Sequence, residues 1–299
     1  MQQGLPKISI VTPSFNQRHF IEETITSVLD LQYPNLEYII IDGGSTDNTV
    51  EIIKKYAKHL KYWVSEKDTG QANAINKGLQ HCTGEIFNWL NSDDYLETGA
   101  LQKIANAFAD GSVHMVAGKV RNFSANNEEI IQNQNLSAEG LMCWKTGVQF
   151  VQPGVWMRRT MLEKFGGIDE QFHYAFDWDL YIRYLYHAPA VKEIPDLLVH
   201  FRLHEQSKTQ SLGEQFLIEE RKIIEKISSL VGYAVLQKVC INKIQKIGWN
   251  ELLSQESRLN NSFIQKFLQV LQQMWKYEKV SFSRQSAGAI KAFWQNRQL

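Results

Sequence analysis

The first 110 residues predict an α/β fold built on a mostly parallel sheet, and two patterns support this prediction. Short β-branched runs, such as residues 7–14 and 36–42, end in turn residues, as strands buried on both faces of a sheet do. Between these two runs, residues 19–31 place Ile21, Ile25 and Val28 along one helical face. Strict alternation of strand and helix favours a parallel sheet with helices on both faces.

The same alternation continues to residue 109. Residues 47–60 repeat the helical pattern behind a candidate N-cap at Thr46 or Asp47. The next expected elements are a strand over 62–65, a helix over 71–81, a strand over 85–91 and a helix over 98–109.

After residue 110 the alternation loosens, and the helices and strands follow no regular order. We expect strands over 113–120, 129–132, 151–157, 191–194 and 197–202, and helices over 160–165 and 177–187. From about residue 205 the pattern is helical only, with helices over 215–230, 233–246, 259–277 and 286–295. The sequence thus predicts a domain over 1–205, in two parts of about 1–112 and 113–205, and a helical region over 206–299.

Composition excludes several classes of protein. With 299 residues, of which 43% are hydrophobic, the chain has enough apolar material for a packed core. Its 32 Lys and Arg balance its 32 Asp and Glu, so no overall charge favours a nucleic-acid partner. Residues 214–299 nevertheless hold 13 basic against 7 acidic residues. This basic excess indicates that the C-terminal region differs from the rest of the chain in its binding partner or in its function.

Cysteine usage and hydropathy predict a location in the cytoplasm. Cys82, Cys143 and Cys240 lie far apart, without the spacing of a zinc site or a disulfide framework. We find neither a secretory signal nor a run of about 18 apolar residues. Peripheral contact with the inner face of a membrane stays open as an alternative.

Polar side chains gather at the predicted carboxyl ends of the parallel strands, where ligands of such sheets bind. The strongest signal is Asp93-Asp94 after an apolar strand, because carboxylate oxygens suit Mg²⁺ and Mn²⁺. The alternative for this pair is a helix cap for the following helix. The residues at the four strand ends are Thr12–Asn16, Asp42–Asp47, Glu66–Gly70 and Asn91–Asp94.

Five motifs follow one another between residues 7 and 210: ISIVTPSFNQ, IIIDGGSTDNT, SEKDTGQANAINKGL, GEIFNWLNSDD and AFDWDLYIRYL. In order and spacing they resemble the family 2 inverting glycosyltransferases of the GT-A fold. The resemblance implies a GT-A type nucleotide-binding sheet flanked by helices, a nucleoside-diphosphate-sugar donor, and Mg²⁺ or Mn²⁺ as cofactor. It also implies a glycan or lipid-linked acceptor in bacterial polysaccharide or glycolipid assembly.

For the nucleotide-sugar, the resemblance implies a loop beneath the nucleotide and an acidic residue that holds its base or ribose. Asp42 matches the acidic residue, although Gly43 stands where the family more often has a second Asp. An ordinary strand-to-helix turn remains the alternative for Asp42. The other matching positions are Thr12, Pro13 and Ser14 in the loop, and Asp68, Gln71, Asn76 and Lys77 beside the metal motif.

For the metal and the reaction, the resemblance implies that Asp94 and His204 bind the cation and that Asp93 contacts the ribose or supports the metal. Arg202 matches a segment that closes over the diphosphate. Asp177 matches the catalytic base, although Phe176 replaces the Glu that precedes it in the family. A first-turn helix acid is the alternative for Asp177.

Two other functions compete with an inverting glycosyltransferase. A sugar nucleotidyltransferase would share the sheet, but it would need a Gly-rich, basic loop after the first strand, and residues 12–18 contain no glycine. An inactive glycan- or nucleotide-binding protein with the same fold is the second alternative. The basic C-terminal helices leave two further possibilities open, which are contact with an anionic membrane surface and packing on the first domain or a second copy.

Overall fold

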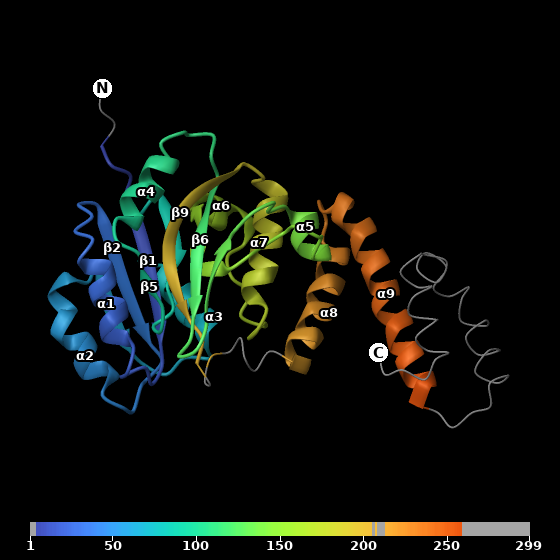
Figure 1. Cartoon of the computed structure of the whole chain (residues 1–299), viewed down its shortest axis with the longest axis horizontal. Helices are drawn as coiled ribbons and strands as arrows, with labels where there is room; N and C mark the ends of the chain where they lie inside the picture. Colours follow the sequence, from blue (N-terminus) through green and yellow to red (C-terminus); the bar gives the residue numbers. More distant parts are fainter. Residues whose placement is uncertain (1–3, 205–206, 208–212, 259–299) are drawn as a thin grey trace. The chain divides into compact units, whose positions relative to one another are not determined.

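The computed structural model describes residues 4–204, 207 and 213–258 (Figure 1). Contacts divide the chain into two compact units, Met1–Glu219 and Glu220–Leu299. The predicted boundary near residue 205 and the predicted helices over 259–277 and 286–295 lie outside the described residues. Within the described ranges, no helix combines the length and the hydropathy needed to cross a bilayer.

Up to residue 107, strands and helices alternate as the sequence predicts. The elements are β1 (Ile8–Ser14), α1 (Ile21–Leu29), β2 (Leu36–Asp42), α2 (Thr49–Tyr56), a 3-10 turn (Ala57–His59), β3 (Tyr62–Ser65), α3 (Gln71–Leu79), β4 (Ile86–Trp89), β5 (Tyr95–Leu96) and α4 (Ala100–Ala107). The two-residue strand β5 was not predicted.

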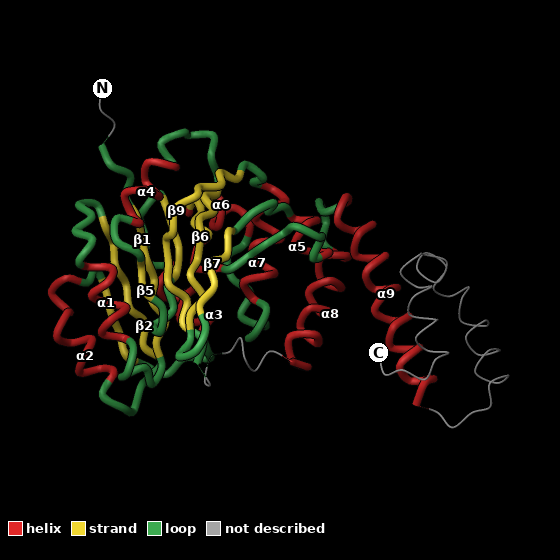
Figure 2. The backbone as a smooth tube through the Cα atoms, in the orientation of Figure 1, coloured by secondary structure: helices red, strands yellow, loops and turns green. Residues whose placement is uncertain are grey.

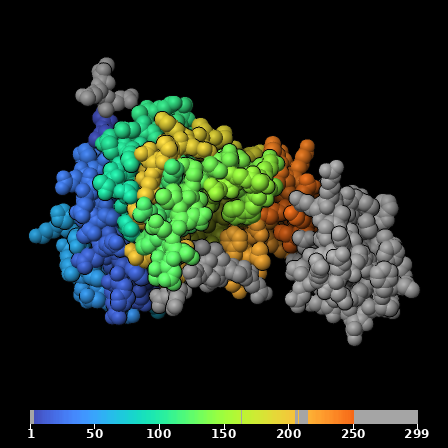
Figure 3. Space-filling model, viewed as in Figure 1, coloured from blue at the N-terminus to red at the C-terminus, as the bar shows by residue number. Residues whose placement is uncertain are grey.

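The remaining described elements are less regular. They are β6 (Met115–Phe123), β7 (Glu128–Gln132), α5 (Ala138–Cys143), a 3-10 turn (Gln152–Gly154), β8 (Val155–Arg158), α6 (Arg159–Phe165), α7 (Phe176–His187), β9 (Val191–Arg202), α8 (Gly213–Ser229) and α9 (Ala234–Arg258). Strand β7, which pairs with the largely buried β6, is exposed over its first three residues, and this part of the chain lies on the visible surface in green (Figure 3).

One sheet organises the first unit. Its strand order is β3-β2-β1-β4-β8-β6-β9-β5, with β7 paired to β6 (Figure 2). The pairs among β3, β2, β1 and β4 are parallel, which confirms the predicted parallel half. Beyond β4, strand β8 pairs antiparallel to both β4 and β6, and β9 pairs parallel to β6.

The sequence predicts two closing strands, over 191–194 and 197–202, and this prediction is wrong because β9 is continuous. Pro195 lies in a local irregularity, where the pairs to β6 skip from Glu193 to Leu197. On the other side of β9, β5 pairs only with Val199 and His200. Pro195 therefore interrupts no regular ladder, and a strand tolerates proline at such a point.

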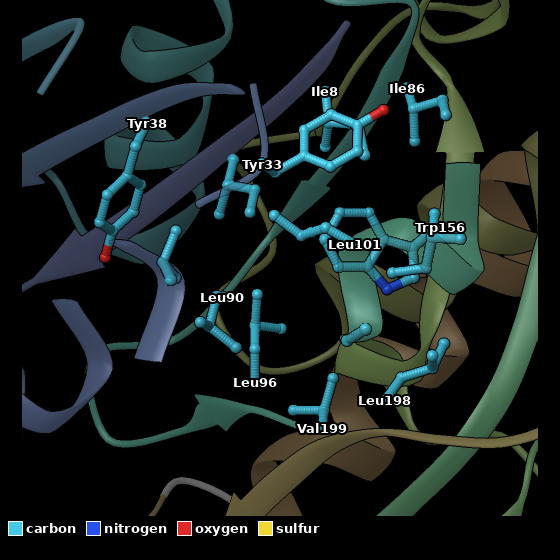
Figure 4. Close-up of a cluster of buried hydrophobic side chains, with 14 of the residues drawn as sticks. Ile8, Tyr33, Tyr38, Ile86, Leu90, Leu96, Leu101, Trp156, Leu198 and Val199 are labelled. Atoms are coloured by element: carbon cyan, nitrogen blue, oxygen red, sulfur yellow. The ribbon is translucent and has the colours of Figure 1, made fainter. Parts of the chain in front are cut away.

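Apolar side chains cover both faces of the parallel half. Ile10 joins a buried cluster with Ile21 and Ile25 of α1, and Figure 4 shows part of that cluster. The neighbouring Val11 points to the other face and lies against α3. A Cβ at Gly78 would lie 2.5 Å from Val11, so glycine allows α3 to pack closely on the sheet. This packing fixes the carboxyl ends of the strands, where the site forms.

A buried carboxylate, that of Glu37, stabilises the amino ends of β1 and β2, at the opposite end of these strands. Glu37 accepts hydrogen bonds from the Ser9 hydroxyl, from the Thr83 hydroxyl and amide, and from the Gly84 amide. Burial alone would raise the pKa of Glu37, but these hydrogen bonds and nearby Lys7 outweigh burial and lower it to about 2. Glu37 is therefore ionised in the folded protein and holds the loop before β4.

In the second unit, apolar side chains of α8 and α9 are buried, and they include Ile223, Ile227, Leu236 and Trp249. Both helices were predicted, and α9 is longer than the predicted range of 233–246.

Candidate active site

A cavity of about 890 Å³ opens at the carboxyl ends of β1, β2, β3 and β4, inside the first unit. Its size lies within the range typical of small-molecule sites. Seven residues that the sequence analysis assigned to the site line this cavity, namely Pro13, Ser14, Asp68, Gln71, Asp93, Asp177 and Arg202. Six others do not line it, namely Thr12, Asp42, Asn76, Lys77, Asp94 and His204.

The end of β1 contributes a polar and an aromatic group to the cavity. The Ser14 side chain is nearly buried, and its hydroxyl has no hydrogen-bond partner among the described residues. The next residue, Phe15, is 57% exposed and lines the same space, although the sequence analysis did not single it out. Thr12, by contrast, points away from the cavity and its hydroxyl lies 3.1 Å from that of Tyr38. An open hydroxyl and an exposed ring suit a ligand that has both polar and flat parts.

Asp42 is fully buried and holds the turn between β2 and α2. Its carboxylate accepts hydrogen bonds from the backbone amides of Gly44 and Ser45 and from the Ser65 hydroxyl. These contacts match the alternative role considered for this residue, an ordinary turn.

Asp68 takes the space that a side chain at position 43 would fill. A Cβ on Gly43 would lie 2.7 Å from Asp68 Oδ2. The Asp68 carboxylate lines the cavity, and it also accepts a hydrogen bond from the Gly70 amide at 2.9 Å. A carboxylate is thus present beside the cavity although the chain has glycine at position 43.

Helix α3 sends one of its three candidate side chains into the cavity. Gln71 lines the cavity and donates a hydrogen bond to Asn91 at 2.7 Å. Asn76 instead donates to the Ile168 carbonyl, and Lys77 pairs with Glu66 at 2.6 Å. Lys77 therefore forms an ion pair outside the cavity.

The two adjacent carboxylates Asp93 and Asp94 point in different directions. Asp93 lines the cavity, and its Oδ2 lies 2.9 Å from Nε2 of His204. Asp94 is only 1% exposed and accepts hydrogen bonds from the Arg202 amide and the Asn91 side chain. Burial raises the pKa of Asp94 well above its ordinary value, and the nearby Asp93 charge raises it further. Asp93, with His204 beside it, therefore faces the cavity, whereas Asp94 is buried and does not line it.

Arg202 brings a positive charge to the cavity within an aromatic cage. Its guanidinium lies 4.7 Å from the ring centre of Phe123 and 5.0 Å from that of Phe20. It also pairs with Glu23 and donates to the backbone carbonyl of Asp93. The side chain is 19% exposed, so this cation remains accessible to an anionic ligand.

Asp177 lines the cavity from the first turn of α7, and the loop before it is held by a carboxylate of α8. The carboxylate of Glu219 accepts hydrogen bonds from the backbone amides of His173, Tyr174 and Ala175, each at 2.8 Å. Glu219 is 8% exposed. The start of α7 is therefore anchored two residues before Asp177.

Sequence reasoning missed Glu219 and the aromatic lining of the cavity. Aromatic residues are also common in the hydrophobic core, so no local pattern in the sequence distinguishes those that face a cavity. The aromatic lining residues are Phe15, Trp89, Trp144, Phe150, Tyr174, Phe176, Trp178, Phe201 and Phe216.

Comparison with known sequences gives one family. The family described as Glycosyl transferase family 2 matches residues 9–166. The putative teichuronic acid biosynthesis glycosyltransferase TuaG of Bacillus subtilis is 41% identical over 108 residues, 34% of this chain and 42% of TuaG. The GalNAc(5)-diNAcBac-PP-undecaprenol beta-1,3-glucosyltransferase of Campylobacter jejuni is 30% identical over 115 residues, 37% of each chain. The match spans less than half the length of either relative.

Solved structures share the fold. Staphylococcus aureus TarS, residues 1–349 with UDP-GlcNAc, aligns with a TM-score of 0.64 at 18% identity, over 78% of this chain and 70% of that one. The mannosyltransferase PcManGT of Pyrobaculum calidifontis, with GDP-Man and Mn²⁺, aligns with a TM-score of 0.53 at 23% identity, over 76% and 63%. These alignments confirm the predicted fold class, a GT-A type α/β sheet flanked by helices.

Proposed function

Because the chain belongs to glycosyl transferase family 2, we propose that it moves a sugar from a nucleoside-diphosphate-sugar to an acceptor hydroxyl, with inversion at the anomeric carbon. One observation carries the proposal: a single cavity is lined by the Asp177 carboxylate, the Asp93 carboxylate and the Arg202 guanidinium. An inverting transfer needs one carboxylate for the attacking hydroxyl and positive charge for the departing diphosphate.

The β1 and β2 ends of the cavity suit the nucleotide. The exposed ring of Phe15 offers a stacking surface for a base, and the open hydroxyl of Ser14 and the carboxylate of Asp68 offer hydrogen-bond partners. TarS binds UDP-GlcNAc and PcManGT binds GDP-Man in their solved complexes. Both ligands are nucleoside-diphosphate sugars, which supports the same class of donor here.

The residues beside the cavity fit a divalent cation that is shared with the donor. Asp93 supplies an oxygen and His204 a nitrogen, 2.9 Å apart and each 19% exposed. Among the described residues, no group of three or more His, Cys, Asp or Glu side chains is close enough to hold a metal. Two protein ligands leave positions for phosphate oxygens, as Mg²⁺ and Mn²⁺ sites commonly do. When bound, such a cation would neutralise charge on the diphosphate.

In the proposed reaction, Asp177 accepts the proton of the acceptor hydroxyl as that oxygen attacks the anomeric carbon. The new carbon–oxygen bond forms while the bond from that carbon to the diphosphate oxygen breaks. Arg202 stabilises the negative charge that passes to the departing nucleoside diphosphate. A retaining route, by analogy with glycosidases, would use a second carboxylate as nucleophile. We assign the other two carboxylates that line the cavity, Asp68 and Asp93, to the nucleotide and to the cation instead.

The relatives support a role in bacterial polysaccharide or glycolipid assembly. TuaG is named for teichuronic acid biosynthesis, and the Campylobacter jejuni enzyme for transfer to an undecaprenol-linked glycan. We therefore propose a glycan, free or lipid-linked, as the acceptor of this chain.

The direct test is release of nucleoside diphosphate from a panel of nucleotide-sugars with Mn²⁺ or Mg²⁺. We expect one donor to be consumed, and Asp177→Asn to slow transfer by about 10²–10⁴, the usual contribution of a general base. Asp93→Ala should raise the Mn²⁺ concentration needed for half-maximal rate, whereas Asp94→Ala should mainly lower the melting temperature. No release from any donor, or transfer by Asp177→Asn at the wild-type rate, would contradict the proposal.

A further inference from the structure

Trp144 is a large aromatic side chain that the fold leaves uncovered inside the cavity. It is 46% exposed, follows directly after α5, and lines the cavity. Its backbone has φ 46° and ψ 53°, a left-handed conformation that bulky residues rarely adopt. The turn is held by hydrogen bonds from the Trp144 amide to the Leu141 carbonyl and from the Lys145 amide to the Gly140 carbonyl. A strained backbone that keeps an indole open to a cavity points to a binding role.

A second tryptophan supports this indole. Trp178 is 1% exposed, and its Nε1 donates a hydrogen bond to the Leu141 carbonyl at 3.1 Å. The rings of Trp144 and Trp178 are nearly parallel, at 8°, with their centres 6.2 Å apart. This offset stacking fixes the plane of the exposed ring.

The aromatic pair shares the cavity with the proposed base, because Trp178 follows Asp177 in α7 and Trp144, Asp177 and Trp178 all line the cavity. An acceptor that delivers its hydroxyl to Asp177 therefore has the indole pair within reach. Phe15 is the other large exposed apolar side chain among the cavity-lining residues, and it lies at the end of β1, whereas Ile130 on β7 is exposed outside the cavity.

We infer that Trp144, supported by Trp178, is a stacking platform for a pyranose ring of the acceptor. This inference rests on the proposed function only in naming the ligand an acceptor. A pyranose presents a face of C–H groups, which the electron-rich face of an indole attracts, while its hydroxyls stay at the ring edge for polar contacts. An open-chain polyol has no such face. The platform thus specifies a closed sugar ring in the acceptor, rather than a polyol phosphate chain.

Saturation-transfer NMR on the full-length chain tests the platform without the donor. The probes are methyl β-D-glucopyranoside, methyl β-D-galactopyranoside and the acyclic sorbitol. We expect saturation to reach the ring C–H protons of at least one pyranoside, and sorbitol to show none. The signal should persist in Trp144→Phe, which keeps an aromatic face, and should fall about tenfold in Trp144→Ala, as loss of about 1.4 kcal/mol of binding requires. Ile130→Ala is the matched control and should behave as the unchanged chain does.

Equal signals from sorbitol and the pyranosides, no signal from any probe, or full signal in Trp144→Ala would each overturn the inference. The outcome is independent of the donor assay. Pyranoside binding at Trp144 without release of nucleoside diphosphate would refute the proposed transferase reaction and leave the platform standing. Release of nucleoside diphosphate without pyranoside binding would refute the platform and leave the proposed transferase reaction standing.

Discussion

Replacement of Glu219 by glutamine tests whether α8 positions Asp177, the proposed catalytic base. The glutamate accepts three backbone hydrogen bonds, one at Oε1 from His173 and two at Oε2 from Tyr174 and Ala175. Glutamine keeps one acceptor oxygen, so its amide group must face at least one of these N–H donors. Hydrogen bonds to charged groups contribute about 1.5–3 kcal/mol each, and a donor left unpaired adds its own cost. We expect Glu219→Gln to weaken the loop before α7 by about 2–4 kcal/mol.

Two assays measure this effect. Hydrogen exchange of the amides at 173–175 should speed up by about a hundredfold, since each factor of ten corresponds to about 1.4 kcal/mol. The kcat of transfer should fall by a similar factor because Asp177 loses its position, while the donor KM stays nearly constant.

The neighbouring Glu220→Gln is the control for the Glu219 variant. Glu220 lies on the same helix and pairs with Lys243 at 2.6 Å, a contact within the second unit. This variant should leave exchange at 173–175 and the kcat unchanged. Wild-type exchange at these amides in Glu219→Gln would refute the reasoning, and so would an equal loss of kcat in both variants.

Three further predictions concern the sheet and the donor side of the cavity. Glu37→Gln should lower the free energy of unfolding by about 3 kcal/mol at pH 7, because the pKa of Glu37 is about 2 in the folded protein and 4.5 in an open chain. This stabilisation is complete above pH 4.5 and disappears as the pH falls towards 2, which urea titrations at several pH values would measure. Gly43→Ala should raise the donor KM by about tenfold, because its Cβ displaces the Asp68 carboxylate, whereas Gly111→Ala, which meets open space, should not change the KM. Lys77→Ala should change the donor KM by less than about twofold, because the exposed ion pair of Lys77 lies outside the cavity. A larger change of KM in steady-state kinetics would show that Lys77 contacts the donor.

The parallel half of the fold and the place of the cavity follow from local patterns in the sequence. Strand and helix periods, together with the turn residues at strand ends, put Ser14, Asp68 and Asp93 on one rim. The direction of each carboxylate depends on partners that are distant in sequence. Asp94 turns inward because β5, which begins one residue later, pairs with β9 and brings the Arg202 amide to it. The Asp42 carboxylate instead accepts hydrogen bonds from the Ser45 amide in its own turn and from the Ser65 hydroxyl on the neighbouring strand β3.

Strand β9 also sets an order of assembly for the site. Each parallel strand pair of β1, β2 and β3 joins segments that follow one another in the chain, whereas the hydrogen bond between Arg202 and Asp94 spans 108 residues. Closing so long a loop costs more chain entropy, so long-range pairing is expected to come late in folding. The parallel half of the sheet can therefore pair β1, β2 and β3 before the contact between Asp94 and Arg202 forms. A chain caught part-way through folding would have the strands that carry Ser14 and Asp42, but not the cation at Arg202 that the proposed chemistry requires.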